Sequence, residues 1–166
     1  MSTPPGYLAL YLRLGRRHHP PVPPDADEDL VVLHVRGGEI TDAGSWVYAW
    51  LRVDYDRPVI YVGATGLQPG TRAWLHLHDP DPDIGRVAAR YPAALDEPLE
   101  VVAVQVPEGV SRSDTKTVAI TRLAEAGLLS EHYVGDPPVA DLPPVPSAAC
   151  RPIERLVAYV GRHAAR

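Results

Sequence analysis

The stretch from Trp46 to His76 constrains the fold more than any other part of the sequence. Its first residues alternate large aromatic with aliphatic side chains, and residues 58–62 form a β-branched and aromatic run. Both patterns are typical of half-buried strands, and the polar cluster at 54–57 between them is typical of a turn. We therefore predict an antiparallel hairpin with strands at 46–52 and 58–63.

Four side chains from this stretch are predicted to converge. Side chains alternate between the two faces of a strand, so either register that the turn allows puts Tyr48 and Tyr61 on the same face. A glycine-rich elbow then leads into a helix on which Arg72 and His76, four residues apart, share one side. Two phenols, a guanidinium and an imidazole would therefore meet at one place.

The order of these residues resembles a known family. Val47-Tyr48-Ala49 and Tyr61-Val62-Gly63, followed by Arg72 and His76, are similar to the two signatures and the first helix of the GIY-YIG nuclease domain. The likeness spans residues 44–134, about half of the chain. It implies an α+β fold, with a small three-stranded antiparallel sheet flanked by helices and with extensions at both ends.

The resemblance also implies a chemistry, phosphodiester hydrolysis of nucleic acid at one divalent cation, normally Mg²⁺. In that scheme a tyrosine or histidine helps to deprotonate the attacking water, an arginine holds the phosphate, and a glutamate on the third helix binds the metal. The position here that aligns with the glutamate is Lys116 or, at best, Thr117. Lys116 cannot ligate Mg²⁺, but its ammonium could occupy the space of the ion. The candidate catalytic residues are Tyr48, Tyr61, Arg72, His76 and Lys116.

The remaining sequence suggests three regions. Residues 1–43 are predicted to be an N-terminal extension packed on the core, with apolar segments at 7–14 and 30–35. Residues 44–134 form the GIY-YIG-like domain, and residues 135–166 a proline-rich linker and a C-terminal helix.

Local signals predict the elements that follow the hairpin. Asp83 would cap a helix ending near Arg90, and Leu99 to Val106 would be the third strand. Ser113 and Asp114 would open a helix that ends at Gly127. The last helix would start at Pro152, because proline suits a first helical turn.

Composition bears on the kind of partner. The formal net charge is −5, and affinity for a polyanion comes mainly from lysine and arginine, so the charge weighs against a nucleic-acid binder without excluding one. A single cysteine, Cys150, excludes an internal disulfide and a multi-cysteine zinc site. Since no apolar run is long enough to span a bilayer and no signal-peptide pattern is visible, we expect no membrane partner and a cytoplasmic protein.

Three functions are compatible with these residues: a nuclease-like enzyme, a catalytically inert binding or scaffolding domain of the same fold, and a pocket that binds or converts a small anionic molecule. Each residue also has an ordinary explanation. Tyr48 and Tyr61 could be simple strand aromatics, and Lys116 an exposed helix lysine. The sequence leaves the oligomeric state open.

Overall fold

The computed structural model describes residues 35–36, 39–40 and 44–164. A short ribbon of β1 (Val35–Arg36) antiparallel to β2 (Glu39–Ile40) is described ahead of the main sheet. The predicted packing of residues 1–43 on the core, and the apolar segment at 7–14, lie outside the described residues.

The predicted hairpin is present as β3 (Trp46–Arg52) and β4 (Val59–Thr65). The two strands pair antiparallel, with Tyr48 opposite Gly63 and Trp50 opposite Tyr61, until an irregularity after Trp50 shifts the register. Tyr48 and Tyr61 therefore lie on one face, as predicted, with ring centroids 6.3 Å apart. β4 starts one residue later than predicted and continues two residues past Gly63.

The third strand, β5 (Leu99–Gln105), pairs antiparallel with the other edge of β3, so the strand order is β4-β3-β5. This three-stranded antiparallel sheet with flanking helices confirms the predicted α+β class. The order leaves β4 at an edge of the sheet. Its first residues are covered from outside by backbone hydrogen bonds from the Ser130 N–H to Val59 and from the Val134 N–H to Ile60.

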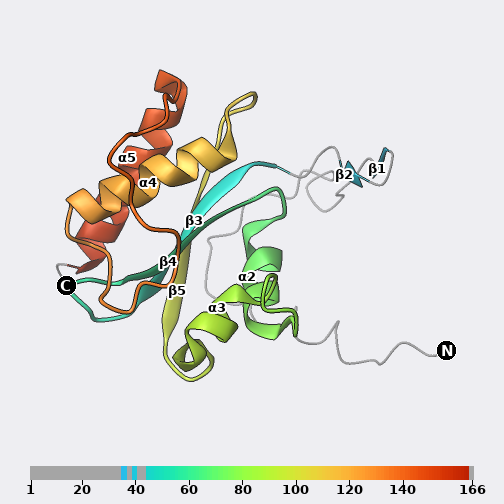
Figure 1. Cartoon of the computed structure of the whole chain (residues 1–166), viewed down its shortest axis with the longest axis vertical. Helices are drawn as coiled ribbons and strands as arrows, with labels where there is room; N and C mark the ends of the chain where they lie inside the picture. The colour runs from blue at the N-terminus through green and yellow to red at the C-terminus, as the bar shows by residue number, and fades with distance from the viewer. Residues whose placement is uncertain (1–34, 37–38, 41–43, 165–166) are drawn as a thin grey trace, which may run out of the picture. The chain divides into compact units, whose positions relative to one another are not determined.

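Four helices cover the two faces of the sheet (Figure 1). On one face α2 (Pro69–His78) and α3 (Arg86–Arg90) pack over the phenols, and a 3₁₀ turn, η1 (Pro92–Leu95), follows. On the other face α4 (Arg112–Glu125) and α5 (Ser147–Ala164) bury the aliphatic side of β3.

The alternation of β3 explains this division. Val47, Ala49 and Leu51 are fully buried against α4 and α5, whereas Tyr48 and Trp50 belong to the aromatic cluster on the opposite face. None of the helices in the described part of the chain combines the length and apolarity needed to cross a bilayer.

The predicted start of the second helix is wrong. Asp83 does not cap it. The carboxylates in this loop bond to backbone N–H groups of the loop itself: Asp79 accepts from the Asp81 N–H, and Asp81 accepts from the Asp83 N–H. The helix begins at Arg86 after Gly85. A Cβ at Gly85 would collide with the carbonyl oxygen of Asp79, so the loop needs glycine at this position.

Two further helix starts differ from prediction. α4 is capped by Ser111, whose hydroxyl accepts the Asp114 N–H at 3.2 Å, and not by the Ser113-Asp114 pair. Gly127, with φ of +70°, follows the end of α4 as expected. α5 starts at Ser147 and carries Pro152 inside it, because the buried stripe of the helix extends back to Ala149.

Candidate functional site

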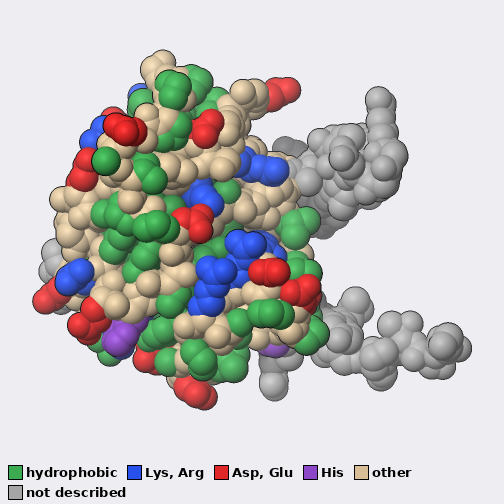
Figure 2. Space-filling model, in the orientation of Figure 1, with side chains coloured by type: hydrophobic (Ala, Val, Ile, Leu, Met, Phe, Trp, Pro, Cys, Tyr) green, Lys and Arg blue, Asp and Glu red, His purple; other side chains and the backbone are tan. Residues whose placement is uncertain are grey.

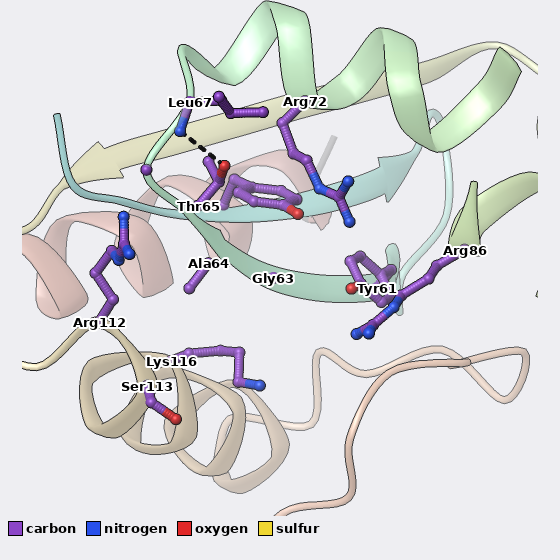
Figure 3. A pocket seen from close by; sticks show the side chains of 12 residues that line it. Tyr61, Gly63, Ala64, Thr65, Leu67, Arg72, Arg86, Arg112, Ser113 and Lys116 are labelled. Atoms are coloured by element: carbon purple, nitrogen blue, oxygen red, sulfur yellow. Dashed lines mark hydrogen bonds between the residues drawn. The ribbon is translucent and has the colours of Figure 1, made fainter. Parts of the chain in front are cut away.

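A cavity of about 470 Å³ lies over the last residues of β4, between the α2–α3 pair and the first turns of α4. Its walls come from five elements. Tyr48 lies on β3, and Figure 3 shows Tyr61 of β4, Arg72 of α2, Arg86 of α3 and Lys116 of α4 around the same space. Helices from both faces of the sheet therefore reach past its edge into one space.

The aromatic side of the cavity is a compact group of three rings. The Tyr48 hydroxyl and Nε2 of His76 are hydrogen-bonded at 2.7 Å, and the Tyr61 ring meets the imidazole edge-on at 5.1 Å. His76 has no exposed surface, and its Nδ1 is buried with no hydrogen-bond partner among the described residues. It supports the phenols from behind and does not line the cavity itself.

The protonation states of this group follow from its surroundings. Burial, together with the charges of Arg72 and Arg86, lowers the pKa of His76 to about 3, so the imidazole is neutral at ordinary pH. Burial and the neighbouring Tyr61 raise the pKa of Tyr48 to about 12, against an opposing hydrogen bond from Arg72. At ordinary pH Tyr48 is therefore a protonated hydroxyl, and His76 is a neutral imidazole that resists protonation.

Gly63 makes the position of Tyr48 possible. The two residues are cross-strand partners, and a Cβ at Gly63 would overlap the Tyr48 hydroxyl and the ring carbon that carries it. Close packing of the Tyr48 ring on the backbone thus explains the glycine at this position.

Four cationic side chains line the cavity: Arg72, Arg86, Arg112 and Lys116. Lys and Arg side chains gather on this face between α4 and the α2–α3 pair in the space-filling view (Figure 2). Arg86 and Arg112 were not predicted from the sequence. A basic residue just inside the start of each helix was the available signal, but nothing local indicated that α3 and α4 face one another.

Lys116 is paired with a carboxylate. Its ammonium forms an ion pair with Asp136 at 2.5 Å, and the hydrogen bond from Lys116 lowers the pKa of the Asp136 carboxyl. Asp136 comes from the loop after α4, a segment that we had assigned to the linker and not to the site. The ion pair neutralises one of the four cations and leaves the guanidinium groups.

The cavity does not fit the divalent cation that the family resemblance implies. Its lining holds no carboxylate, and no group of three or more potential ligands from His, Cys, Asp and Glu occurs in the described residues. Glu125, at the far end of α4, is engaged with Arg122. The donors present are phenols, guanidinium groups and an ammonium, which favour an anion.

The structure therefore places Tyr48, Tyr61, Arg72 and Lys116 around one cavity and His76 directly behind it. Their catalytic roles stay predictions. Comparison of the chain with family models, with curated proteins and with solved structures finds no match.

Proposed function

We propose that the cavity over β4 binds a phosphate-type anion. The observation that carries this proposal is the lining itself, in which three guanidinium groups, two phenols and the Asp136-paired Lys116 meet. Guanidinium groups bind phosphate through paired N–H donors, and hydroxyl groups add neutral donors. The GIY-YIG resemblance supports the same ligand chemistry, since that family acts on phosphodiesters.

Arg72 is the main anion contact in this proposal. It lies beside the Tyr48 hydroxyl, and its hydrogen bond to that hydroxyl opposes the rise in the Tyr48 pKa. Its positive charge also lowers the pKa of His76. Figure 3 shows its guanidinium pointing into the same space as that of Arg86, with Tyr61 between them. A phosphate at this point would meet two guanidinium groups and two phenols.

The test is calorimetric titration of the protein with inorganic phosphate. We expect the Arg72→Ala variant to lose about tenfold or more in affinity, because a hydrogen bond between charged groups is worth about 1.5–3 kcal/mol. Arg155→Ala is the matched control, since Arg155 is an exposed arginine on α5 outside the cavity. Equal affinities for the parent and Arg72→Ala would contradict the proposal.

A second candidate, phosphodiester hydrolysis, is favoured by the Tyr48–His76 pair. The buried imidazole holds the Tyr48 hydroxyl at 2.7 Å, so a protonated phenol lies beside Arg72 where a scissile phosphate would bind and could stabilise charge that develops on it. Plasmid nicking measured across a magnesium series and in EDTA tests this candidate and the Mg²⁺ expectation together. Binding of phosphate without nicking under any condition would instead favour the inert binding domain.

The proposal also includes a location for the protein, the cytoplasm. A single cysteine suits a reducing compartment, and the proposal retains the cytoplasm as the place where this domain meets its ligand.

A further inference from the structure

The cations of the cavity fall into two groups. Arg72 and Arg86 stand on either side of Tyr61, and both act on the Tyr48–His76 pair. Arg112 lies at the other end, near the turn that follows Thr65 (Figure 3). A Cβ at Gly66 would overlap Nη1 of Arg112, so the guanidinium rests against the glycine backbone at the end of β4.

Local structure explains how Arg112 reaches this position. It is the first residue of α4, directly after the Ser111 cap, and the turn at the end of β4 is held by the hydrogen bond from the Leu67 N–H to the Thr65 hydroxyl at 3.0 Å. Lys116 follows one helical turn later on the same side of α4. The helix therefore presents two cations along one wall of the cavity.

The charge of Arg112 is available to a ligand. No carboxylate within residues 44–164 forms an ion pair with it, whereas Lys116 is paired with Asp136. Arg112 also stands at the positive end of a 14-residue helix, which adds to its attraction for an anion. One phosphate at Arg72 and Arg86 would leave this second cationic end unused.

We propose that the cavity takes a ligand with two phosphate groups, one held by Arg72 and Arg86 over the phenols and the other held by Arg112 at Gly66. This inference rests on the proposed anion-binding function and specifies its ligand. The size of the cavity suits a small molecule, since sites of about 300–1,000 Å³ are usual for such ligands. Two phosphates can come from a small bisphosphate or from neighbouring links of a nucleic-acid strand.

The experiment compares adenosine 5′-monophosphate with adenosine 3′,5′-bisphosphate by calorimetry at fixed ionic strength. For the parent protein we expect the bisphosphate to bind about tenfold more tightly, the increment of one further charge-assisted contact. In Arg112→Gln this advantage should fall to about twofold or less, because the loss of the Arg112 contact weakens the bisphosphate far more than the monophosphate. Arg155→Gln, the surface control, should keep the full advantage.

Gly66→Ala provides an independent variant, because it displaces the Arg112 guanidinium without removing its charge. It should reduce the bisphosphate advantage in the same direction. Circular dichroism checks that both variants keep the fold, which is expected since Arg112 is exposed.

Each outcome separates the two proposals. If the bisphosphate binds no better than the monophosphate, or keeps its advantage in Arg112→Gln, the second phosphate site is wrong while the first stands. If neither ligand binds, or binding is insensitive to Arg72→Ala, both proposals fail.

A short single-stranded DNA identifies the source of the two phosphates. Displacement of the bisphosphate by this DNA at lower concentration, lost in Arg112→Gln, would assign the sites to a nucleic-acid strand. Failure of the DNA to displace the bisphosphate would assign them to a small bisphosphate.

Discussion

At the scale of single residues, the cavity depends on an uncharged position as much as on its cations. The Tyr48 ring occupies the volume that a side chain at Gly63 would need, and the same tyrosine is hydrogen-bonded to the buried His76. A side chain added at Gly63 would therefore displace both the ring and the imidazole, because both are buried in close-packed surroundings.

Gly63→Ala is therefore expected to lower the free energy of unfolding by about 1–3 kcal/mol, the usual effect of overpacking a filled core. Urea unfolding measures the change. Gly70→Ala is the matched control, because a Cβ at Gly70 on α2 meets no atom within 4 Å. That variant should be as stable as the parent or more stable by up to about 1 kcal/mol. Equal stability of Gly63→Ala and the parent would show that Tyr48 can leave its position freely.

The neutral His76 predicts a pH dependence of stability. Its pKa is lowered to about 3 in the folded protein, whereas in the unfolded chain the imidazole takes up a proton below its ordinary value of 6.5. The unfolded state then binds more protons, so the free energy of unfolding falls as pH decreases from about 6.5 towards 3. The contribution of this residue should be about 1–2 kcal/mol between pH 6.5 and 5.

Urea unfolding at several pH values between these limits measures the slope, above the range in which the carboxyl groups titrate. His76→Gln should lose this component of the slope. His78→Gln, which changes an exposed histidine of the same helix, should retain it. A slope unchanged in His76→Gln would mean that the imidazole is protonated in the folded state.

At the scale of elements, alternation and turn signals predicted all three strands of the main sheet to within a few residues. Helix starts were harder to predict, because they depend on hydrogen bonds that several sequences can satisfy. Ser111 and Ser113 are equally good caps by residue type, and the structure uses Ser111. In the loop before α3 the carboxylates of Asp79 and Asp81 accept hydrogen bonds from backbone N–H groups two residues later and do not cap the helix.

The start of α5 gives an element-scale prediction. Pro152 lies inside the helix, where it cannot donate the hydrogen bond to the Ala148 carbonyl. Pro152→Ala should therefore raise the free energy of unfolding, by about 1–3 kcal/mol after the added freedom of the unfolded chain is subtracted. Urea unfolding checks this result. A loss of stability would instead support a helix that begins at Pro152, as its sequence pattern suggests.

At the scale of the whole molecule, charge is distributed unevenly. The chain has a formal net charge of −5, yet four of its 16 Lys and Arg residues line one cavity. Outside these four residues the chain carries 21 Asp and Glu against 12 Lys and Arg (16 minus 4), so a long polyanion that extends beyond the cavity is opposed by the net charge, whereas a small anion can respond to the cavity alone. This distribution favours the small bisphosphate over a nucleic-acid strand as the source of the two phosphates.

The same scale limits what sequence can predict about the site. Tyr48, Tyr61, Arg72 and His76 come from consecutive elements, so their convergence follows from strand alternation and helix periodicity. Arg86, Arg112 and Asp136 join them only because helices on opposite faces of the sheet extend past the edge of β4. That arrangement is set by the packing of two separate cores, for which no short segment carries a signal.

Lys116 has a practical consequence. It is the only lysine in the sequence, and it lies in the cavity beside Asp136. Reductive methylation with ¹³C-labelled formaldehyde would therefore introduce a single side-chain dimethylamine signal, at the wall of the site. The NMR shift of that signal would report occupancy of the cavity in the unmutated sequence, for any candidate ligand.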